Sequence, residues 1–224
     1  MIKLAPSILT ADMGHLDDQI RAAEAGGADY IHLDVMDGQF VPPITFGPLV
    51  VEAVRRATTL PLDVHLMIVD PERQFEAFAE AGADIINLHV EATRHIDRLL
   101  RRLHALHKRA GVCINPGTPL SAIEEVADVA DQVMLMAINP GWGGQKFLPA
   151  MLDKLQRLRA MLDARGVRPD VEVDGGVKAN NIAACVAAGA NVLVCGSSVY
   201  NREASPRENL RELRGAAEQV SVRP

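Results

Sequence analysis

The chain has 224 residues and a formal net charge of −6. This length predicts one domain over residues 1–224, and the acidic balance excludes nucleic acid as the main partner. No apolar stretch is long enough to span a membrane, and the first residues lack the apolar region of a signal peptide, so we expect no membrane partner. The three cysteines form no CxxC pair. We therefore expect a reducing location, the cytoplasm or a comparable organelle interior.

Short apolar runs alternate along the chain with segments in which apolar residues recur at helical spacing. In chain order, strands are predicted at residues 3–7, 30–34, 62–67, 85–89, 112–115, 132–136, 171–174 and 192–195. Helices are predicted at residues 16–25, 48–57, 71–81, 94–109, 152–165 and 180–188. Because only 4% of the residues are aromatic, the core must be aliphatic, which suits strands buried on both faces. Strand alternating with helix predicts βαβ units and a parallel sheet.

A short phrase of Ala and Gly followed by Asp or Asn recurs at residues 25–29, 81–84 and 188–191. Each copy ends a helical pattern and precedes a strand, where Gly supplies a left-handed helix cap. Asp29 and Asp84 are 55 residues apart and enclose two units, whereas Asp84 and Asn191 are 107 apart and enclose four. Eight units of about 27 residues nearly fill the chain, which predicts an α/β fold of the single (β/α)8 TIM barrel type. The alternative, an open doubly wound sheet, normally carries a G-x-G-x-x-G turn that this chain lacks.

Polar side chains interrupt the predicted strands near their carboxyl ends. His32 and Asp34 are two residues apart, so both point towards the barrel axis while Leu33 points outwards. His65 occupies the equivalent layer of the third strand, and Asp174 ends the seventh. Two imidazoles and two carboxylates converging at one mouth predict a site for one divalent cation such as Zn²⁺, Fe²⁺, Mn²⁺ or Co²⁺. The alternative is that each is a hydrogen-bonded polar residue at a strand end.

Three Gly-rich turns follow the late strands, at residues 141–144, 175–177 and 196–198. Barrels frequently bind phosphate after strands seven and eight, through backbone N–H groups and a helix N-terminus. Glycine permits the backbone to approach the anion. Any one turn alone is explained by turn chemistry, but their joint position predicts a phosphate site.

Five runs of the sequence now point to one family: LAPSIL (residues 4–9), HLDVMDG (32–38), DVHLM (63–67), NPGWGGQ (139–145) and EVDGG (172–176). In this order they resemble the signature blocks of ribulose-phosphate 3-epimerases, and the resemblance spans residues 4 to 198. Two positions depart from the family pattern, Trp142 where Phe is expected and Pro43 where Asn is common. Neither falls on a metal ligand that the resemblance implies.

The resemblance implies an isomerase of the pentose phosphate pathway that interconverts D-ribulose 5-phosphate and D-xylulose 5-phosphate. It implies one divalent metal bound by His32, Asp34, His65 and Asp174, with Asp34 and Asp174 as the acid–base pair. The residues that it places at the substrate are Ser7, His65, Gly141, Trp142, Gly143, Gly144, Asp174, Gly175, Gly176, Gly196 and Ser197. Members of the family are commonly dimers or hexamers, so a homo-oligomer is expected.

Epimerisation beside a ketone requires that a proton leave one face of the carbon and that another arrive on the opposite face. Two carboxylates can do this through an ene-diolate, whose charge a metal stabilises. From ribulose we expect Asp34 to be the base and Asp174 the acid. Met36, Met67 and Met136 are predicted to lie near the same mouth. The resemblance implies that they form an apolar cover for the ene-diolate, and the alternative is that they simply fill gaps in the packing.

Three alternative functions remain open at this stage. An allulose-6-phosphate 3-epimerase would share the chemistry and differ in the sugar pocket. A metal-dependent aldolase on the same fold would need only one strong acid–base group, so the Asp34 and Asp174 pair disfavours it. A non-catalytic sugar-phosphate-binding barrel would need neither both histidines nor both aspartates.

Overall fold

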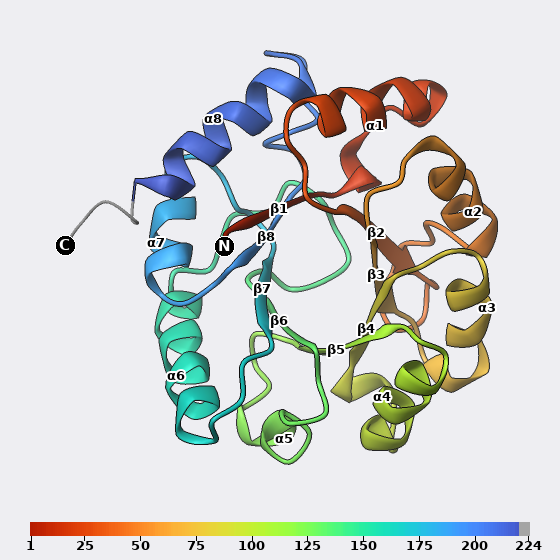
Figure 1. Ribbon diagram of the computed structural model, residues 1–224, viewed down its shortest axis with the longest axis vertical. Coiled ribbons are helices and arrows are strands. Elements are labelled where there is room, and N and C mark those ends of the chain that lie inside the picture. Colours follow the sequence, from red (N-terminus) through yellow and green to blue (C-terminus); the bar gives the residue numbers. More distant parts are fainter. Residues whose placement is uncertain (220–224) are drawn as a thin grey trace.

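A ring of parallel strands surrounded by helices makes up the computed structural model, which describes residues 1–219 (Figure 1). The strands are β1 (Lys3–Pro6), β2 (Ile31–Met36), β3 (Leu62–Met67), β4 (Ile85–His89), β5 (Arg109–Ile114), β6 (Gln132–Met136), β7 (Asp170–Asp174) and β8 (Val192–Cys195). The α-helices are α1 (Leu16–Ala25), α2 (Pro48–Ala57), α3 (Phe75–Glu80), α4 (Ile96–Ala105), α5 (Ser121–Glu124), α6 (Ala150–Ala164), α7 (Ile182–Ala187) and α8 (Pro206–Glu218). Short 3-10 helices are η1 (Ile8–Thr10), η2 (Met13–His15), η3 (Pro71–Arg73) and η4 (Val90–Ala92).

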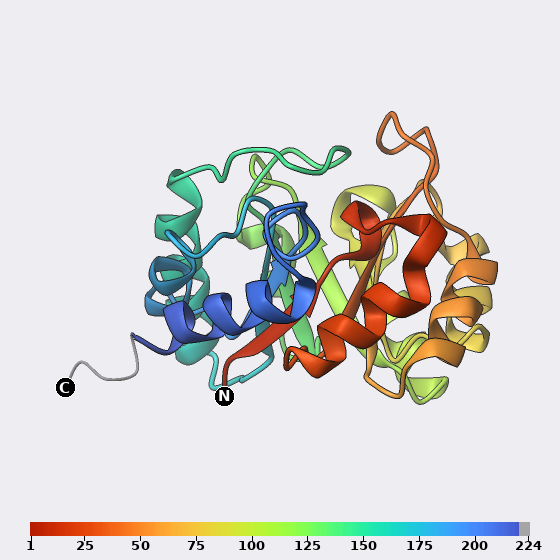
Figure 2. The same ribbon diagram turned by 90° about the horizontal axis from the view of Figure 1, so that it is seen from above.

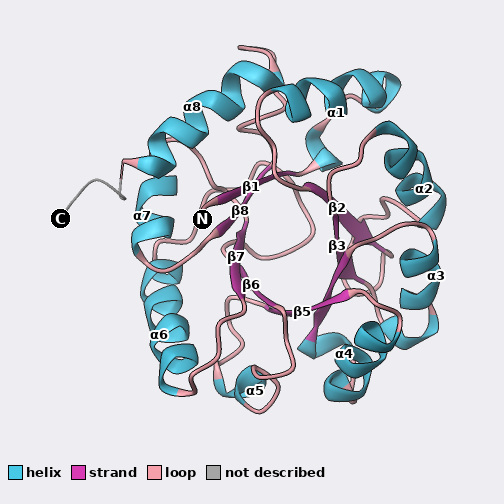
Figure 3. Cartoon of the chain, in the orientation of Figure 1, coloured by secondary structure: helices cyan, strands magenta, loops and turns pink. Residues whose placement is uncertain are grey.

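The strands follow one another around the ring in chain order, and all pairs are parallel. β1 pairs with β8, and the remaining junction between β1 and β2 is joined by a parallel bridge between Ser7 and His32. The Tyr30 N–H also donates to the Leu4 carbonyl, at 3.3 Å. These contacts close the ring, and the helices lie outside it (Figure 3). The predicted (β/α)8 barrel is confirmed.

The predicted helices over residues 16–25 and 48–57 have the same limits as α1 and α2. Strand β5 begins at Arg109, three residues before the predicted start, because the weakly strand-forming pair Ala110 and Gly111 concealed its first half. The predicted helix over 71–81 is interrupted at Gln74 and divides into η3 and α3. Helices α5 and α8 were not predicted. The capping box of Ser205 and Glu208 was a readable signal for α8.

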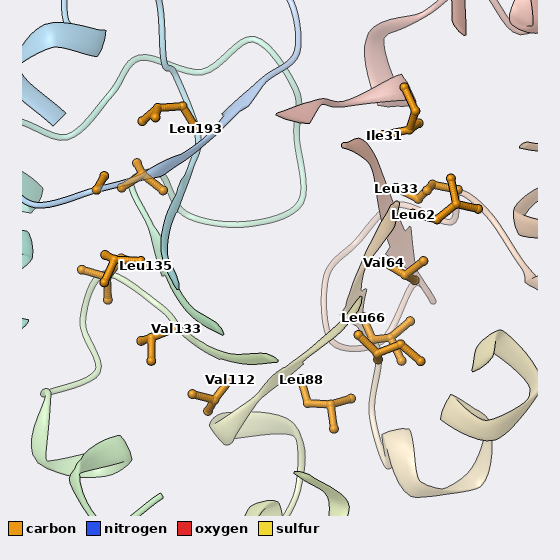
Figure 4. Close-up of a cluster of buried hydrophobic side chains, with 14 of the residues drawn as sticks. Ile31, Leu33, Leu62, Val64, Leu66, Leu88, Val112, Val133, Leu135 and Leu193 are labelled. Atoms are coloured by element: carbon orange, nitrogen blue, oxygen red, sulfur yellow. The ribbon is translucent and has the colours of Figure 1, made fainter. Parts of the chain in front are cut away.

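Alternation along each strand divides the barrel into an outer and an inner set of side chains. Outward-facing residues such as Leu33, Val64 and Leu135 pack between the strands and the helices and are at most 1% exposed (Figure 4). The inward-facing set is far more polar, because several strands place His, Asp, Asn, Gln or Glu at alternate positions. This aliphatic outer layer stabilises the barrel. Side chains that can bind a ligand or transfer a proton therefore face the interior of the barrel.

All eight strands end on the same face of the barrel, where the connections that follow them gather (Figure 2). The segment between β6 and α6, residues 137–149, extends over the mouth of the ring, and the β2–α2 segment stands up beside it (Figure 2). The barrel thereby assembles the predicted polar residues and Gly-rich turns at one mouth.

Helix ends repeat one backbone geometry, in which a residue with positive φ follows the last turn. Gly27 (φ 92°), Gly82 (φ 112°) and Gly189 (φ 111°) occupy this position in the three repeated phrases, as the cap interpretation predicted. His107 (φ 57°) occupies it after α4, where the Lys108 N–H closes the cap on the Leu103 carbonyl at 3.0 Å. The predicted helix over residues 94–109 included His107, but α4 ends at Ala105.

We expect His107→Gly to raise the free energy of unfolding by about 0.5–1 kcal/mol, because a side chain with a Cβ is strained at positive φ. Urea unfolding followed by far-UV circular dichroism measures the change. Gly27→Ala is the matched control, since a Cβ there meets nothing within 4 Å and only the backbone conformation opposes it. It should lower stability by a similar amount. A His107→Gly protein less stable than the unmodified one would contradict this account.

Candidate active site

A cleft of about 530 Å³ opens at the carboxyl ends of the strands. Every residue predicted to contact the substrate lines it, except His65, which is fully buried behind Asp34. Met36, Met67 and Met136 also line the cleft, so their predicted location is confirmed. The residues that the sequence placed at the substrate therefore gather around one cleft at the carboxyl ends of the strands.

Four side chains from β2, β3 and β7 meet at the floor of the cleft. His65 Nδ1 lies 3.2 Å from Asp34 Oδ1 and 3.7 Å from Asp174 Oδ2. His32 Nε2 lies 3.4 Å from the same Asp34 oxygen. The four predicted ligands therefore offer atoms within 4.8 Å of one another. Register explains part of the convergence, because Asp34 pairs with His65 across the β2–β3 ladder, and Asp174 is the last residue of β7.

The spacing of these atoms fits a divalent metal ion. In a tetrahedral site with metal–ligand bonds of about 2.0–2.2 Å, neighbouring ligand atoms are about 3.3 Å apart. The three distances above fall around this value, and only the shortest of them, 3.2 Å between His65 Nδ1 and Asp34 Oδ1, is also a hydrogen bond. His32 Nε2 is buried and has no hydrogen-bond partner among the described residues, as expected of a lone pair that faces a cation. These buried His and Asp groups can hold a metal ion.

Beneath this layer a second polar layer supports His32. Its Nδ1 lies 2.6 Å from Asp63 Oδ2, which fixes the ring and leaves Nε2 facing the cleft. Asp63 Oδ1 accepts from Asn87 at 2.8 Å and from Gln132 at 3.1 Å. Gln132 also donates to Glu172, at 2.6 Å. All five side chains are fully buried, so the ring of His32 is held in place by a rigid hydrogen-bonded layer.

This second layer was not predicted, although the sequence carried a signal for it. Asp63 stands two residues before His65, and Glu172 stands two before Asp174. The alternation that points His65 and Asp174 into the barrel also points these two carboxyls inwards, one layer deeper. Asn87 and Gln132 follow the same rule on β4 and β6.

The two aspartates at the floor differ in protonation. Burial opposes ionisation of both, but His32 and His65 lower the pKa of Asp34 well below its ordinary value. Burial, with the charge of Asp34 added, raises the pKa of Asp174 to about 7. In the metal-free protein Asp34 is therefore a carboxylate at neutral pH, whereas Asp174 is partly protonated.

We expect the Asp174 carboxyl to titrate near pH 7 in the metal-free protein. Its protonated form predominates below that pH and is lost as the pH rises through the pKa of Asp174. Added metal favours the carboxylate, so the transition should move to lower pH. The carboxylic-acid C=O band in infrared difference spectra, assigned by its absence from Asp174→Asn, measures both. A midpoint near the ordinary value of 3.8 in the metal-free protein would contradict this prediction.

The three Gly-rich turns lie along one wall of the cleft. Within residues 1–219, the N–H groups of Gly176, Val177, Ser197 and Ser198 have no hydrogen-bond acceptor, and no Lys or Arg lines the cleft. A phosphate there would be held by backbone N–H groups. Glycine has a second purpose, since a Cβ on Gly176 would lie 2.4 Å from the Phe147 nitrogen. Close packing of the β7 turn on the β6–α6 segment requires glycine as well.

Comparison with known proteins shows the family to which the chain belongs. The model of the ribulose-phosphate 3 epimerase family matches residues 3–200. The ribulose-phosphate 3-epimerase of Bacillus subtilis is 50% identical over 217 residues, which are 96% of this chain and 100% of that protein. The enzyme of that name from Synechocystis sp. is 53% identical over 202 residues, which are 89% of this chain and 88% of that protein. The chain belongs to the ribulose-phosphate 3-epimerase family.

Solved structures of other barrels share the fold at low sequence identity. A 3-hexulose-6-phosphate synthase from Salmonella typhimurium superimposes with a TM-score of 0.71 and 16% identity, over 98% of this chain and 100% of that one. At this identity the likeness shows the fold alone. Among the described residues, no helix combines the length and apolarity needed to cross a bilayer.

Proposed function

We propose that this protein is a ribulose-phosphate 3-epimerase that interconverts D-ribulose 5-phosphate and D-xylulose 5-phosphate. Family membership supports the reaction, and one observation carries the mechanism. Two carboxyls face the same cleft, and in the metal-free protein the pKa of Asp34 is lowered while that of Asp174 is raised to about 7. Neighbouring titratable groups whose pKa values are pushed apart are suited to act as base and acid at one pH.

In the direction from ribulose, the Asp34 carboxylate takes the proton from C3, which leaves an ene-diolate. The Asp174 carboxylic acid then gives its proton to the opposite face of C3, so the configuration is inverted. The two residues exchange roles in the reverse direction. Ser7 Oγ donates to Asp34 Oδ2 at 2.6 Å, which orients the base and places the hydroxyl beside the sugar. The methionines Met36, Met67 and Met136 exclude water from the reacting carbons.

His32, Asp34, His65 and Asp174 are proposed as the ligands of one divalent cation. Imidazole with carboxylate suits Zn²⁺, Fe²⁺, Mn²⁺ or Co²⁺. When bound, the metal acts as a Lewis acid that stabilises the negative charge of the ene-diolate. The substrate phosphate is assigned to the turns after β7 and β8, at Gly175–Gly176 and Gly196–Ser197, with Gly141–Gly144 covering the sugar.

The same family membership supports two further expectations. We propose a cytoplasmic location, in the pentose phosphate pathway, and a homo-oligomer, either a dimer or a hexamer. Analytical ultracentrifugation tests the second of these, and a monomer at micromolar concentration would overturn it.

The reaction is tested by incubating the metal-loaded protein with D-ribulose 5-phosphate in D₂O and following C3 by NMR. We expect xylulose 5-phosphate to appear with deuterium at C3, because the proton that returns comes from an exchangeable carboxyl. No product and no deuterium at C3 would overturn the proposal. Hexulose 6-phosphates, including allulose 6-phosphate, would then be tested in the same assay.

A further inference from the structure

Behind the floor of the cleft, a chain of three side chains leads away from His65. His65 Nε2 lies 2.8 Å from His89 Nε2, and His89 Nδ1 lies 3.1 Å from Glu91 Oε2. The two imidazole planes are within 25° of each other, with centroids 5.0 Å apart, so the rings meet edge to edge. Both histidines are fully buried, and the ring of Phe40 covers His89 at 4.8 Å. The contact between the two histidines is therefore shielded from solvent, whereas the Glu91 side chain is 23% exposed.

Glu91 determines the direction in which the protons lie. Its Oε1 accepts the Asn115 N–H at 2.8 Å and the hydroxyl of Thr118, so Glu91 acts as a carboxylate that accepts at both oxygens. His89 Nδ1 must therefore carry a proton and donate it to Glu91. A neutral His89 then has a lone pair on Nε2, which can only accept, so His65 Nε2 must carry a proton.

The remaining nitrogen of a neutral His65 is Nδ1, and it holds a lone pair. That lone pair faces Asp34 Oδ1 at 3.2 Å and Asp174 Oδ2 at 3.7 Å. A lone pair directed at carboxylates is unfavourable without a cation between them. The opposite orientation would protonate His65 Nδ1 and leave His89 Nδ1 facing Glu91 without a proton.

We propose that His89 and Glu91 are positioning residues that hold His65 as the Nε2–H tautomer, so that its Nδ1 lone pair is reserved for the metal. This inference rests on the proposed function only in taking His65 as a ligand. His32 is held by a single carboxylate, Asp63. His65 is also held by a carboxylate, that of Glu91, but the imidazole of His89 lies between the two.

His65, His89 and Cys113 also lie close enough together to resemble a second metal site. The N···N distance of 2.8 Å argues for the hydrogen bond instead. Two nitrogens bound to one tetrahedral zinc ion would be about 3.3 Å apart. Cys113 belongs to an apolar cluster with Met134 and Met136, and burial raises the pKa of its thiol well above the ordinary value. A protonated thiol is a poor metal ligand.

We call the hydrogen-bonded chain from Glu91 through His89 to His65 the relay. Its effect on the metal site is tested by Zn²⁺ affinity, measured in competition with a chromophoric chelator and without substrate. His89→Leu removes the acceptor for His65 Nε2–H and should weaken Zn²⁺ binding about 10–100-fold. His89→Gln keeps an acceptor for His65 and a donor for Glu91, so it should recover most of the lost affinity. His104→Leu is the matched control, because His104 is an exposed histidine that pairs with Asp131 at 2.8 Å. It should bind Zn²⁺ as the unmodified protein does.

Proton positions give a second readout that does not depend on any variant folding. Long-range ¹H–¹⁵N correlation spectra of the Zn²⁺-loaded protein should show protons on His65 Nε2 and His89 Nδ1. A proton on His65 Nδ1 would overturn the relay, and so would a folded His89→Leu protein that binds Zn²⁺ within twofold of the unmodified one. Neither measurement uses substrate. The proposal for His89 and Glu91 can therefore be overturned while the epimerase activity is confirmed, and the epimerase activity can be overturned while the proposal for His89 and Glu91 is confirmed.

Discussion

Replacing Asp174 with Asn is expected to lower kcat for epimerisation by about 10³–10⁴-fold, because the amide keeps the shape of the side chain and cannot transfer a proton. Exchange of the C3 proton separates the two halves of the reaction. With Asp34 intact, the variant should still exchange the C3 hydrogen of D-ribulose 5-phosphate with D₂O, without inverting C3. It should not exchange the C3 hydrogen of D-xylulose 5-phosphate.

The reciprocal variant, Asp34→Asn, should lose exchange from ribulose and keep exchange from xylulose in the fraction of molecules that retain metal. Metal content is measured in each sample, since Asp34 is also a proposed ligand. Asp12→Asn is the matched control, because Asp12 is an exposed carboxylate that caps η2 through the Gly14 N–H at 2.9 Å. An Asp174→Asn enzyme that keeps a tenth of the normal kcat would contradict a two-carboxylate mechanism.

Removal of the metal is expected to lower the rate by at least about 10³-fold, since a metal ion contributes several kcal/mol to charge stabilisation and about 1.4 kcal/mol corresponds to tenfold in rate. Dialysis against a chelator, followed by return of Zn²⁺, Fe²⁺, Mn²⁺ or Co²⁺ one at a time, measures the loss and identifies which ions restore activity. The measurement requires metal content and rate from the same sample.

The barrel should survive this treatment, because its outer layer of aliphatic side chains, such as Leu33 and Leu135, does not depend on the site. Far-UV circular dichroism should be unchanged, while the melting temperature falls. A ligand at 100 times its Kd stabilises the native state by about 2.7 kcal/mol, and chelation removes this stabilisation by the bound metal. Full activity in a sample shown to be free of metal would contradict the proposed role of His32 and its neighbours.

Much of this architecture was readable from local pattern. The limits of α1 and α2, the barrel closure implied by the repeated Ala-Gly phrases, and the inward direction of His32 and Asp34 all depend on periods of two or 3.6 residues and on glycine caps. Helix α5 was missed because its four residues are too few to show a period. His107 was assigned to the helix because a non-glycine residue at positive φ has no sequence signature.

By itself, the sequence determined the fold, the family and the identity of the four polar groups at the mouth, because side-chain alternation and co-linear motifs are local properties. Only the tertiary structure decided which groups support them. His89 ends β4 and Glu91 follows it on η4, whereas Asp63, Asn87, Gln132 and Glu172 come from four different strands, β3, β4, β6 and β7. Their hydrogen bonds and pKa shifts depend on the register between those strands, on burial and on distances across the barrel, and these quantities exist only once the ring has closed.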